Sequence, residues 1–290
     1  MDTLPSFDTT PLPYQSWGNL SSPNQVIIAL HGFCGASADF TNWANICTQQ
    51  NPNLAIYALN LRGQGFDPVV NRRGDIPTHH DWLRDLWHAT KTLKIKPPHA
   101  ECIWAGESLG AIIACHALTH ATHHVRCDRL ILLSPVISLD HLVPQWMQSL
   151  ATCIAKIQPE RRIPLSLIAS NQNLQVSHHP TNHASQSATN AWHVDSFSLR
   201  FLAAVQRLIS QMPSLSHQIS IPLLVVNGGQ DFFLPVETIE SWLAHLPETT
   251  PLTHHYFSES YHLLLYDHRA DTIAQCCADW ISPPPQVPEM

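Results

Sequence analysis

The sequence of 290 residues predicts an α/β fold with a mainly parallel central sheet flanked by helices. Short apolar runs with no alternation of polar residues are typical of parallel strands that are buried on both faces. Segments with helical periodicity fall between these runs, and this alternation favours a parallel sheet. Glycine is scarce, 10 of 290 residues, and most glycines lie where the apolar runs end. Because ligands bind beyond the carboxyl ends of such strands, we expect the functional site at these turns.

The expected elements follow one another in a regular order. Strands are predicted at 26–30, 54–61, 102–105, 130–133, 223–226 and 252–257. Helices are predicted at 36–49, 80–93, 109–120, 236–246 and 269–281.

The alternation stops between residues 138 and 217, which form the predicted insertion. This segment contains two helical patterns, at 146–157 and 198–212, separated by a polar region at 171–190. We therefore expect an α/β core made of 1–137 and 218–290, with 138–217 as an inserted helical cap.

Composition excludes several classes of partner and location. The 15 Lys and Arg against 22 Asp and Glu give a net charge of −7, and no basic run is present, so nucleic acid is not an expected partner. No uninterrupted apolar segment is long enough for a membrane span, and the first residues lack the pattern of a secretory signal. The eight cysteines are scattered without a C-x-x-C pair, which favours reduced thiols. These features together predict a cytoplasmic protein.

The clearest chemical motif is Gly106-Glu107-Ser108-Leu109-Gly110, a G-x-S-x-G sequence between a predicted strand and a predicted helix. Such a turn holds the serine hydroxyl above the sheet, and the flanking glycines let strand and helix approach closely. The amide of Leu109 then begins a helix, where it can donate to a developing oxyanion. Ser108 is therefore the predicted nucleophile.

A serine nucleophile needs a base, and the base needs an acid that holds its tautomer. Asp231 directly follows the strand at 223–226, and His262 lies in the loop after the strand at 252–257. His254 and His255 fall inside that strand, so their positions are less suitable. The sequence thus predicts Asp231 as acid and His262 as base.

The turn after the first predicted strand, His31-Gly32-Phe33-Cys34, is interpreted as the second part of an oxyanion hole. Gly32 would let the chain turn, and the amide of Phe33 would be the second donor. An ordinary strand-to-loop turn is the alternative. Arg62 is expected to brace its own turn, and Glu107 has a structural interpretation.

Histidine is abundant, with 20 residues, but the sequence does not predict a metal site. Adjacent pairs such as His79-His80 point their side chains in different directions on a helix or strand. His116 and His120 have the i, i+4 spacing of a helical metal pair, yet no carboxylate or cysteine nearby completes a site. Solvated or hydrogen-bonded histidines are expected instead.

The segments LHGF, NLRGQG, GESLG, NGGQD and SYHLLLYD occur in the order and approximate spacing of the α/β-hydrolase superfamily. The sequence most resembles the monoacylglycerol lipase and lysophospholipase branch of that superfamily. This resemblance implies the triad of Ser108, Asp231 and His262 and the oxyanion amides of Phe33 and Leu109. Gln64 departs from the histidine that is usual in the R-G-H-G turn, and GESLG departs from G-H-S-M-G.

The predicted function is therefore a cofactor-free serine hydrolase that cleaves a carboxylic ester, with a small apolar ester or monoacyl lipid as substrate. The alternatives are a thioesterase, an acyltransferase, a C–C bond hydrolase, an aminopeptidase, or a non-catalytic binding scaffold on the same fold. In the insertion, Trp146, Met147 and Leu150 have two interpretations. Their face lines an acyl pocket and touches a lipid surface, or it packs on the core.

Overall fold

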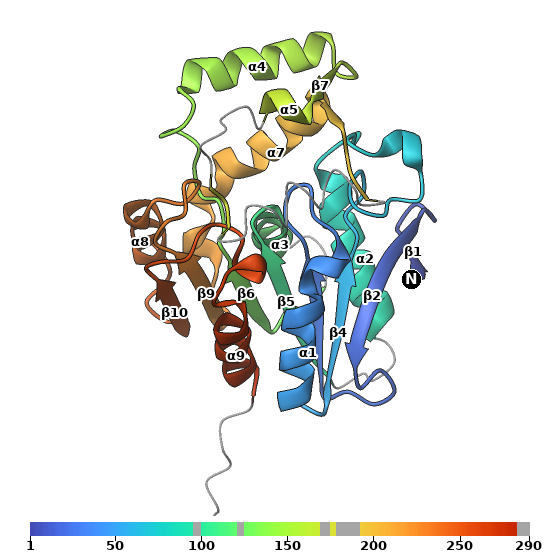
Figure 1. Ribbon diagram of the computed structural model, residues 1–290, viewed down its shortest axis with the longest axis vertical. Helices are drawn as coiled ribbons and strands as arrows, with labels where there is room; N and C mark the ends of the chain where they lie inside the picture. Colours follow the sequence, from blue (N-terminus) through green and yellow to red (C-terminus); the bar gives the residue numbers. More distant parts are fainter. Residues whose placement is uncertain (95–99, 121–124, 169–174, 178–191, 283–290) are drawn as a thin grey trace, which may run out of the picture.

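Six neighbouring parallel strands form most of the sheet, and an antiparallel hairpin extends it at one edge (Figure 1). The computed structural model describes residues 1–94, 100–120, 125–168, 175–177 and 192–282. The strand order is β1-β2-β4-β3-β5-β6-β9-β10, and the predicted α/β fold is confirmed. The strands are β1 (Asp2–Pro5), β2 (Pro11–Gly18), β3 (Gln25–Leu30), β4 (Leu54–Leu59), β5 (Glu101–Glu107), β6 (Arg129–Leu133), β9 (Leu223–Gly228) and β10 (Leu252–Phe257).

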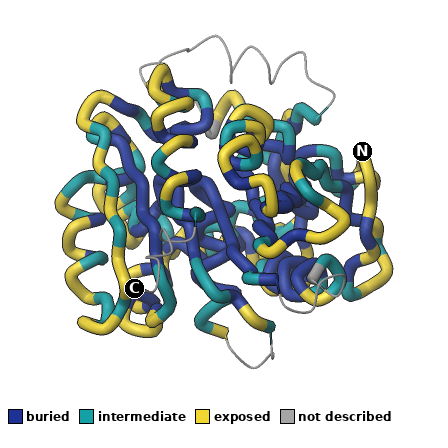
Figure 2. The backbone as a smooth tube through the Cα atoms, turned by 90° about the horizontal axis from the view of Figure 1, so that it is seen from below, coloured by how far each residue is buried: buried dark blue, intermediate teal, exposed yellow. Residues whose placement is uncertain are grey.

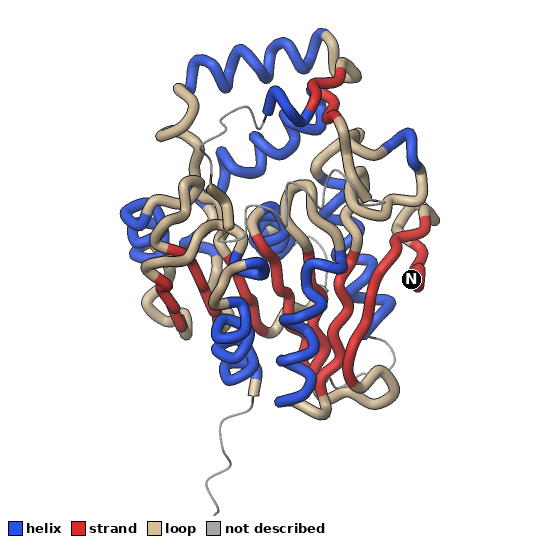
Figure 3. The backbone as a smooth tube through the Cα atoms, viewed as in Figure 1, coloured by secondary structure: helices blue, strands red, loops and turns tan. Residues whose placement is uncertain are grey.

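Helices cover both faces of this sheet (Figure 3). Helices α1 (Thr41–Gln50) and α9 (Ala270–Ile281) pack on one face, with Ile27 and Ile103 of the sheet. Helices α2 (His80–Lys94), α3 (Leu109–Thr119) and α8 (Val236–Ala244) pack on the other, with Ile28 and Trp104. Successive side chains of a strand point to opposite faces, so each central strand contributes to both layers. The central strands are accordingly buried along their length (Figure 2).

The antiparallel hairpin of β1 and β2 was not among the predicted strands. β1 has only four residues, and Pro5 pairs with Pro11 beside the connecting turn. Proline cannot donate to a strand ladder, so these residues fit only an edge, where one side of the strand is unpaired. A short edge strand that contains proline gives little of the apolar signal on which strand prediction depends.

Among the boundaries that differ from the prediction, two have an identifiable reason. The helix expected at 36–49 begins at Thr41, because Ser37–Phe40 form a 3-10 turn in which Asp39 accepts from the amide of Ala36. The strand expected at 54–61 ends at Leu59. The amide of Leu61 has left the ladder and donates to His31 Nε2 at 3.0 Å.

The segment predicted as an insertion, residues 138–217, lies between β6 and β9. It contains α4 (Gln145–Ile157), β7 (Arg162–Pro164), α5 (Leu165–Ile168), β8 (Ser196–Ser198) and α7 (Leu199–Gln211). Helices α4 and α7 correspond to the two helical patterns, whereas the ribbon of β7 and β8 was not predicted. The polar region at 171–190 lies outside the described residues except for 175–177. Helix α7 contacts both α3 and α4, and α4 lies farthest from the sheet (Figure 1).

The loop after β4 anchors the base of this insertion. Asp75 accepts hydrogen bonds from Arg200 Nε, at 2.7 Å, and from the hydroxyl of Ser198, at 2.5 Å. The amide of Ser198 also donates to the carbonyl of Gly74 at 2.7 Å. Ser198 caps α7 as well, by accepting from the amide of Phe201. The first turn of α7 is thus fixed to the core.

Candidate active site

The turn between β5 and α3 places Ser108 above the sheet in a strained backbone conformation. Ser108 has φ +52° and ψ −112°, a region that residues other than glycine rarely adopt. A Cβ on Gly110 would lie 1.9 Å from the carbonyl oxygen of Leu30, and one on Gly106 would lie 2.3 Å from the carbonyl carbon of Gly110. Both positions therefore require glycine, since the helix lies directly against the strands.

The structure brings together the three residues predicted as a triad. His262 Nε2 lies 2.8 Å from Ser108 Oγ, and His262 Nδ1 lies 2.7 Å from Asp231 Oδ2. The second carboxylate oxygen of Asp231 accepts from the amides of Phe233, at 2.8 Å, and Leu234, at 3.2 Å. Because Nδ1–H donates to Asp231, Nε2 is free to accept the hydroxyl proton of Ser108.

The environment of His262 favours its protonated form. Burial opposes protonation, but the charge of Asp231, its hydrogen bond and the nearby Glu107 outweigh burial and raise the pKa of His262. The ring of Phe233 packs against the imidazole with centroids 4.9 Å apart. This arrangement suits a group that takes a proton and holds it while charge develops.

Of the two predicted oxyanion residues, Leu109 directly follows Ser108, and Phe33 directly follows Gly32, which lies next to the serine. Leu109 is the first residue of α3. The amides of the first turn of a helix have no acceptor within the helix, because no helical carbonyl precedes them. Phe33 follows Gly32, and a Cβ on Gly32 would lie 3.3 Å from Ser108 Cβ. Two backbone amides next to the serine can stabilise negative charge on a substrate oxygen.

Two aromatic residues of the insertion that were not predicted as site residues pack on Phe33. The ring of Phe197 stacks on Phe33 with centroids 4.5 Å apart, and Phe201 lies 6.1 Å away. Both are buried. Their spacing of four residues, with Phe197 just before the helix predicted at 198–212 and Phe201 within it, was the available signal. It did not indicate which loop the rings would contact.

The predicted pocket residues of α4 lie elsewhere. Trp146, Met147 and Leu150 are 67%, 45% and 52% exposed, and α7 lies between α4 and the core helix α3 (Figure 1). The structure does not bring them to the triad. Instead, α4 turns small and polar side chains towards α7, where Gln148 and Thr152 contact Gln206.

Glu107, beside the serine, is an ionisable group of the site. Its side chain is fully buried, and Oε1 accepts from the amide of Leu265 at 3.1 Å, in the loop that follows His262. Burial, together with the nearby charge of Asp39, raises the pKa of Glu107 to about 7. Glu107 therefore changes charge near neutral pH within the surroundings of the triad.

Several of the described histidines other than His262 make hydrogen bonds or ring contacts. His116 Nε2–H donates to the carbonyl of Leu208, and His120 Nδ1–H donates to the carbonyl of His116. His123, His124, His178 and His179 lie outside the described residues. Among the described residues, no three His, Cys, Asp or Glu side chains gather as a metal site would require. No described helix is long and apolar enough to cross a bilayer.

A family model described as serine aminopeptidase, S33, matches residues 21–269, most of the chain. The chain belongs to this S33 family of α/β-hydrolases. The resemblance to the superfamily is thereby confirmed, and the S33 protein is a serine hydrolase.

Individual relatives are distant in sequence and close in fold. The S33 protein is 23% identical to a monoacylglycerol lipase of Mycolicibacterium smegmatis, over 88% of this chain and 89% of the relative. A soluble variant of monoglyceride lipase from Saccharomyces cerevisiae, solved with a substrate analogue, superposes with a TM-score of 0.79 at 15% identity, covering 96% of this chain and 93% of that one. A carboxyl esterase from Bacillus coagulans, solved with glycerol, gives a TM-score of 0.80 at 14% identity, covering 96% of each chain.

Proposed function

We propose that this protein hydrolyses carboxylic esters with Ser108 as nucleophile, His262 as base and Asp231 as the acid that orients the base. The observation that carries this proposal is the continuous hydrogen-bond chain from Ser108 Oγ through His262 to Asp231, at the strained turn before α3. A serine hydroxyl becomes an effective nucleophile when a positioned imidazole accepts its proton.

In the proposed reaction, Ser108 Oγ attacks the ester carbonyl as its proton passes to His262 Nε2. The amides of Phe33 and Leu109 stabilise the tetrahedral oxyanion. His262 then gives its proton to the departing alcohol, and an acyl group remains on Ser108. A water molecule, deprotonated by His262, attacks this acyl-enzyme and releases the acid and the free serine.

The proposed substrate is a monoacylglycerol or a similar small apolar ester. Relatives named as monoacylglycerol lipases support this class, as do the aromatic rings of Phe33, Phe197 and Phe201 beside the serine turn. An aminopeptidase would need a carboxylate to hold the amine of its substrate. In the insertion, Glu160 and Asp195 are strongly exposed and face Arg200 and His193, so they do not support that alternative.

The first test measures hydrolysis of p-nitrophenyl esters from acetate to palmitate by the native protein and by Ser108→Ala. The variant is expected to lose roughly 10³-fold or more in rate, because the nucleophile is missing. Ser134→Ala, which alters another buried serine at a strand end, serves as the matched control and should keep its activity.

Ester hydrolysis that survives in Ser108→Ala would overturn the assignment of the nucleophile. Hydrolysis that depends on Ser108 but yields less free acid when glycerol is added would indicate acyl transfer to the alcohol. A folded native protein without turnover of any ester would favour a binding scaffold.

We further propose that residues 138–217 act as a cap and that α4 meets a lipid surface. The apolar face of α4 is exposed, whereas its polar side chains face α7. An amphipathic helix with this orientation can bury its apolar side at a membrane interface. The apolar face consists of Trp146, Met147, Leu150, Ile154 and Ile157.

Sedimentation with phosphatidylcholine vesicles tests this surface. The double variant Trp146→Ser, Ile157→Ser should bind vesicles less than the native protein, while both hydrolyse a soluble acetate ester equally. Val70→Ser removes an exposed apolar side chain outside the insertion and should leave vesicle binding unchanged. Equal binding by all three proteins would contradict the proposed lipid contact.

A further inference from the structure

Residues 31–37, which include Phe33, are held by three hydrogen bonds from the end of β4 and the turn that follows it. The amide of Leu61 donates to His31 Nε2 at 3.0 Å. The amide of Ser37 donates to Asn60 Oδ1 at 3.0 Å. The third bond is the shortest: the amide of Cys34 donates to Gln64 Oε1 at 2.7 Å. The loop with the proposed oxyanion donor is thus fixed by groups outside the triad.

The conformation of Cys34 explains why this third bond is needed. Cys34 has φ +62°, in the left-handed region that a residue with a side chain seldom occupies. Such a conformation persists only when the surroundings determine it. Gln64 fixes the peptide between Phe33 and Cys34, and His31 Nδ1–H donates to the carbonyl of Gly32, at 2.8 Å, in the preceding peptide. Because a peptide is planar, holding the Gly32 carbonyl also orients the Phe33 amide in the same peptide. His31 therefore acts on the peptide before Phe33, and Gln64 acts on the peptide after it.

Gln64 has an energetic cost at this position. The side chain is completely buried, and within the described part of the chain its Nε2 has no hydrogen-bond partner. A buried donor without a partner costs about 1–3 kcal/mol, which an apolar side chain would avoid. The only hydrogen bond that the Gln64 side chain makes within the described part of the chain is the one that Oε1 accepts from the amide of Cys34.

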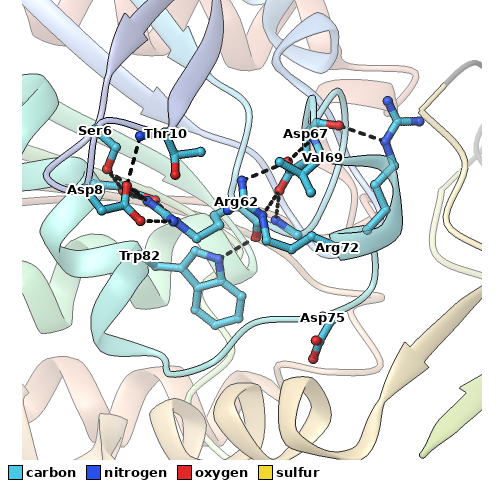
Figure 4. A network of polar contacts seen from close by, with 12 residues as sticks. Ser6, Asp8, Thr10, Arg62, Asp67, Val69, Arg72, Asp75 and Trp82 are labelled. Carbon is cyan, nitrogen blue, oxygen red and sulfur yellow. Dashed lines mark hydrogen bonds and ion pairs between the residues drawn. The ribbon is translucent and has the colours of Figure 1, made fainter. Parts of the chain in front are cut away.

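The turn that carries Gln64 is itself held by ion pairs and hydrogen bonds of Arg62 and Asp67 (Figure 4). Arg62 pairs with Asp8 of the hairpin turn and with Asp85 of α2. Asp67 accepts from the amide of Gly63 at 2.6 Å and pairs with Arg72. A side chain on a turn fixed from both sides can determine the position of a strained loop.

We propose that Gln64 is a positioning residue for the oxyanion hole, acting through the amide of Cys34 on the orientation of the Phe33 amide. This inference rests on the proposed function, since it assumes that Phe33 donates to the oxyanion. A donor that only meets the transition state affects kcat, whereas a contact to the bound ester affects KM. Loss of the Gln64 oxygen should therefore act on kcat.

The experiment uses Gln64→Met, which keeps the length of the side chain but removes the amide. With p-nitrophenyl butyrate, kcat is expected to fall by roughly 10- to 100-fold. This fall does not exceed the roughly 100- to 1000-fold fall in kcat that follows removal of a whole oxyanion donor. KM should change by less than about 3-fold, because ground-state binding does not use this donor. The inhibition constant of an aryl trifluoromethyl ketone, whose adduct with serine has an oxyanion, should rise together with the fall in kcat.

Gln25→Met is the matched control, because Gln25 donates two hydrogen bonds at the opposite end of β3. This variant should lose stability without loss of kcat. Should Gln64→Met fail to fold, Gln64→Asn tests the same point by withdrawing the amide oxygen by one methylene, and the same selective loss of kcat is expected.

Three results separate the outcomes. A native protein without hydrolysis dependent on Ser108 overturns the proposed function, and the role of Gln64 with it. Native activity together with unchanged kcat and inhibitor affinity in a folded Gln64 variant overturns only the role of Gln64. A loss confined to KM or to stability would also overturn it.

Discussion

Glu107 links the pH dependence of the fold to that of the site. Its carboxyl group is buried beside Ser108, it accepts from the amide of Leu265, and its charge raises the pKa of His262. The pKa of Glu107 is itself raised to about 7, chiefly by burial. One residue therefore affects two measurable pH profiles, and each is a separate prediction.

The first prediction concerns stability. The pKa of Glu107 is about 7 in the folded protein against an ordinary value of 4.5, so the fold favours the protonated form. The stabilisation by that form is complete below pH 4.5 and is lost as pH rises through 7, by up to about 3 kcal/mol. Glu107→Gln should therefore gain stability relative to the native protein between pH 5 and pH 8, as measured by urea unfolding. The exposed control Glu248→Gln should show no such change.

The second prediction concerns activity. His262 must be neutral to accept the proton of Ser108, so its pKa sets the acidic limb of kcat/KM. Removing the negative charge of Glu107 lowers the pKa of His262, and the acidic limb of Glu107→Gln should move to lower pH. An identical limb in both proteins would show that the charge of Glu107 does not reach His262.

At this scale the sequence located the residues that stand at strand ends, and the structure shows them in contact. Ser108 and Asp231 each follow a buried strand, and His262 follows β10, the half-exposed last strand of the sheet. Their approach therefore depends only on parallel strands ending at one edge. Glu107 and Gln64 acquire their importance from contacts with Leu265 and Cys34. No local pattern specifies such contacts, and for that reason the sequence indicated only a structural use for Glu107.

Among the elements, α7 connects the insertion to the core in two ways. Its amino end is held by the pairing of Arg200 with Asp75, and Phe201 packs near Phe33. Because the same helix contacts the loop after β4 and the loop after β3, loosening its first turn should affect both stability and the site.

A double-mutant cycle on Asp75→Asn and Arg200→Met measures this attachment. The pair is partly shielded from water and has two hydrogen bonds, so we expect a coupling energy of about 1 kcal/mol in urea unfolding at neutral pH. The exposed pair of Glu259 and Arg269 is the control, and its coupling should be close to zero. Equal coupling in both pairs would show that Arg200 does not specifically anchor α7.

Helix α4 illustrates what periodicity can and cannot predict. The apolar spacing correctly indicated a helix, because residues three and four apart share one face. It did not indicate what that face would meet. The structure turns Gln148 and Thr152 inward and leaves Trp146 exposed, an orientation that depends on the polar Gln206 of α7.

Across the whole molecule, the eight cysteines are free, and they differ strongly in exposure. Cys153 on α4 is exposed, Cys34 and Cys276 are half-buried, and burial raises the pKa of both half-buried thiols. Thiol reagents react with the thiolate. Burial therefore slows the reaction of a cysteine in two ways: it blocks access of the reagent, and it raises the pKa so that less thiolate is present.

Ellman's reagent should therefore label one thiol of the native protein rapidly, and all eight after unfolding in guanidinium chloride. Cys153→Ser should remove the rapid phase and keep the ester hydrolysis unchanged. Several rapid thiols in the native protein would indicate that the core opens more readily than its burial suggests.

The order of strands in the sheet also has a consequence during synthesis on the ribosome. β5 and Ser108 emerge early, but β9 and β10 join the sheet beyond β6 only after the insertion has been made. Ser108 and His262 are 154 residues apart in the chain, whereas Asp231 precedes His262 by 31. A nascent chain therefore has its serine in place while both partners of that serine are still absent. The hydroxyl proposed as nucleophile therefore gains its proposed base only after the last strand of the sheet, β10, and the residues up to His262 have been synthesised.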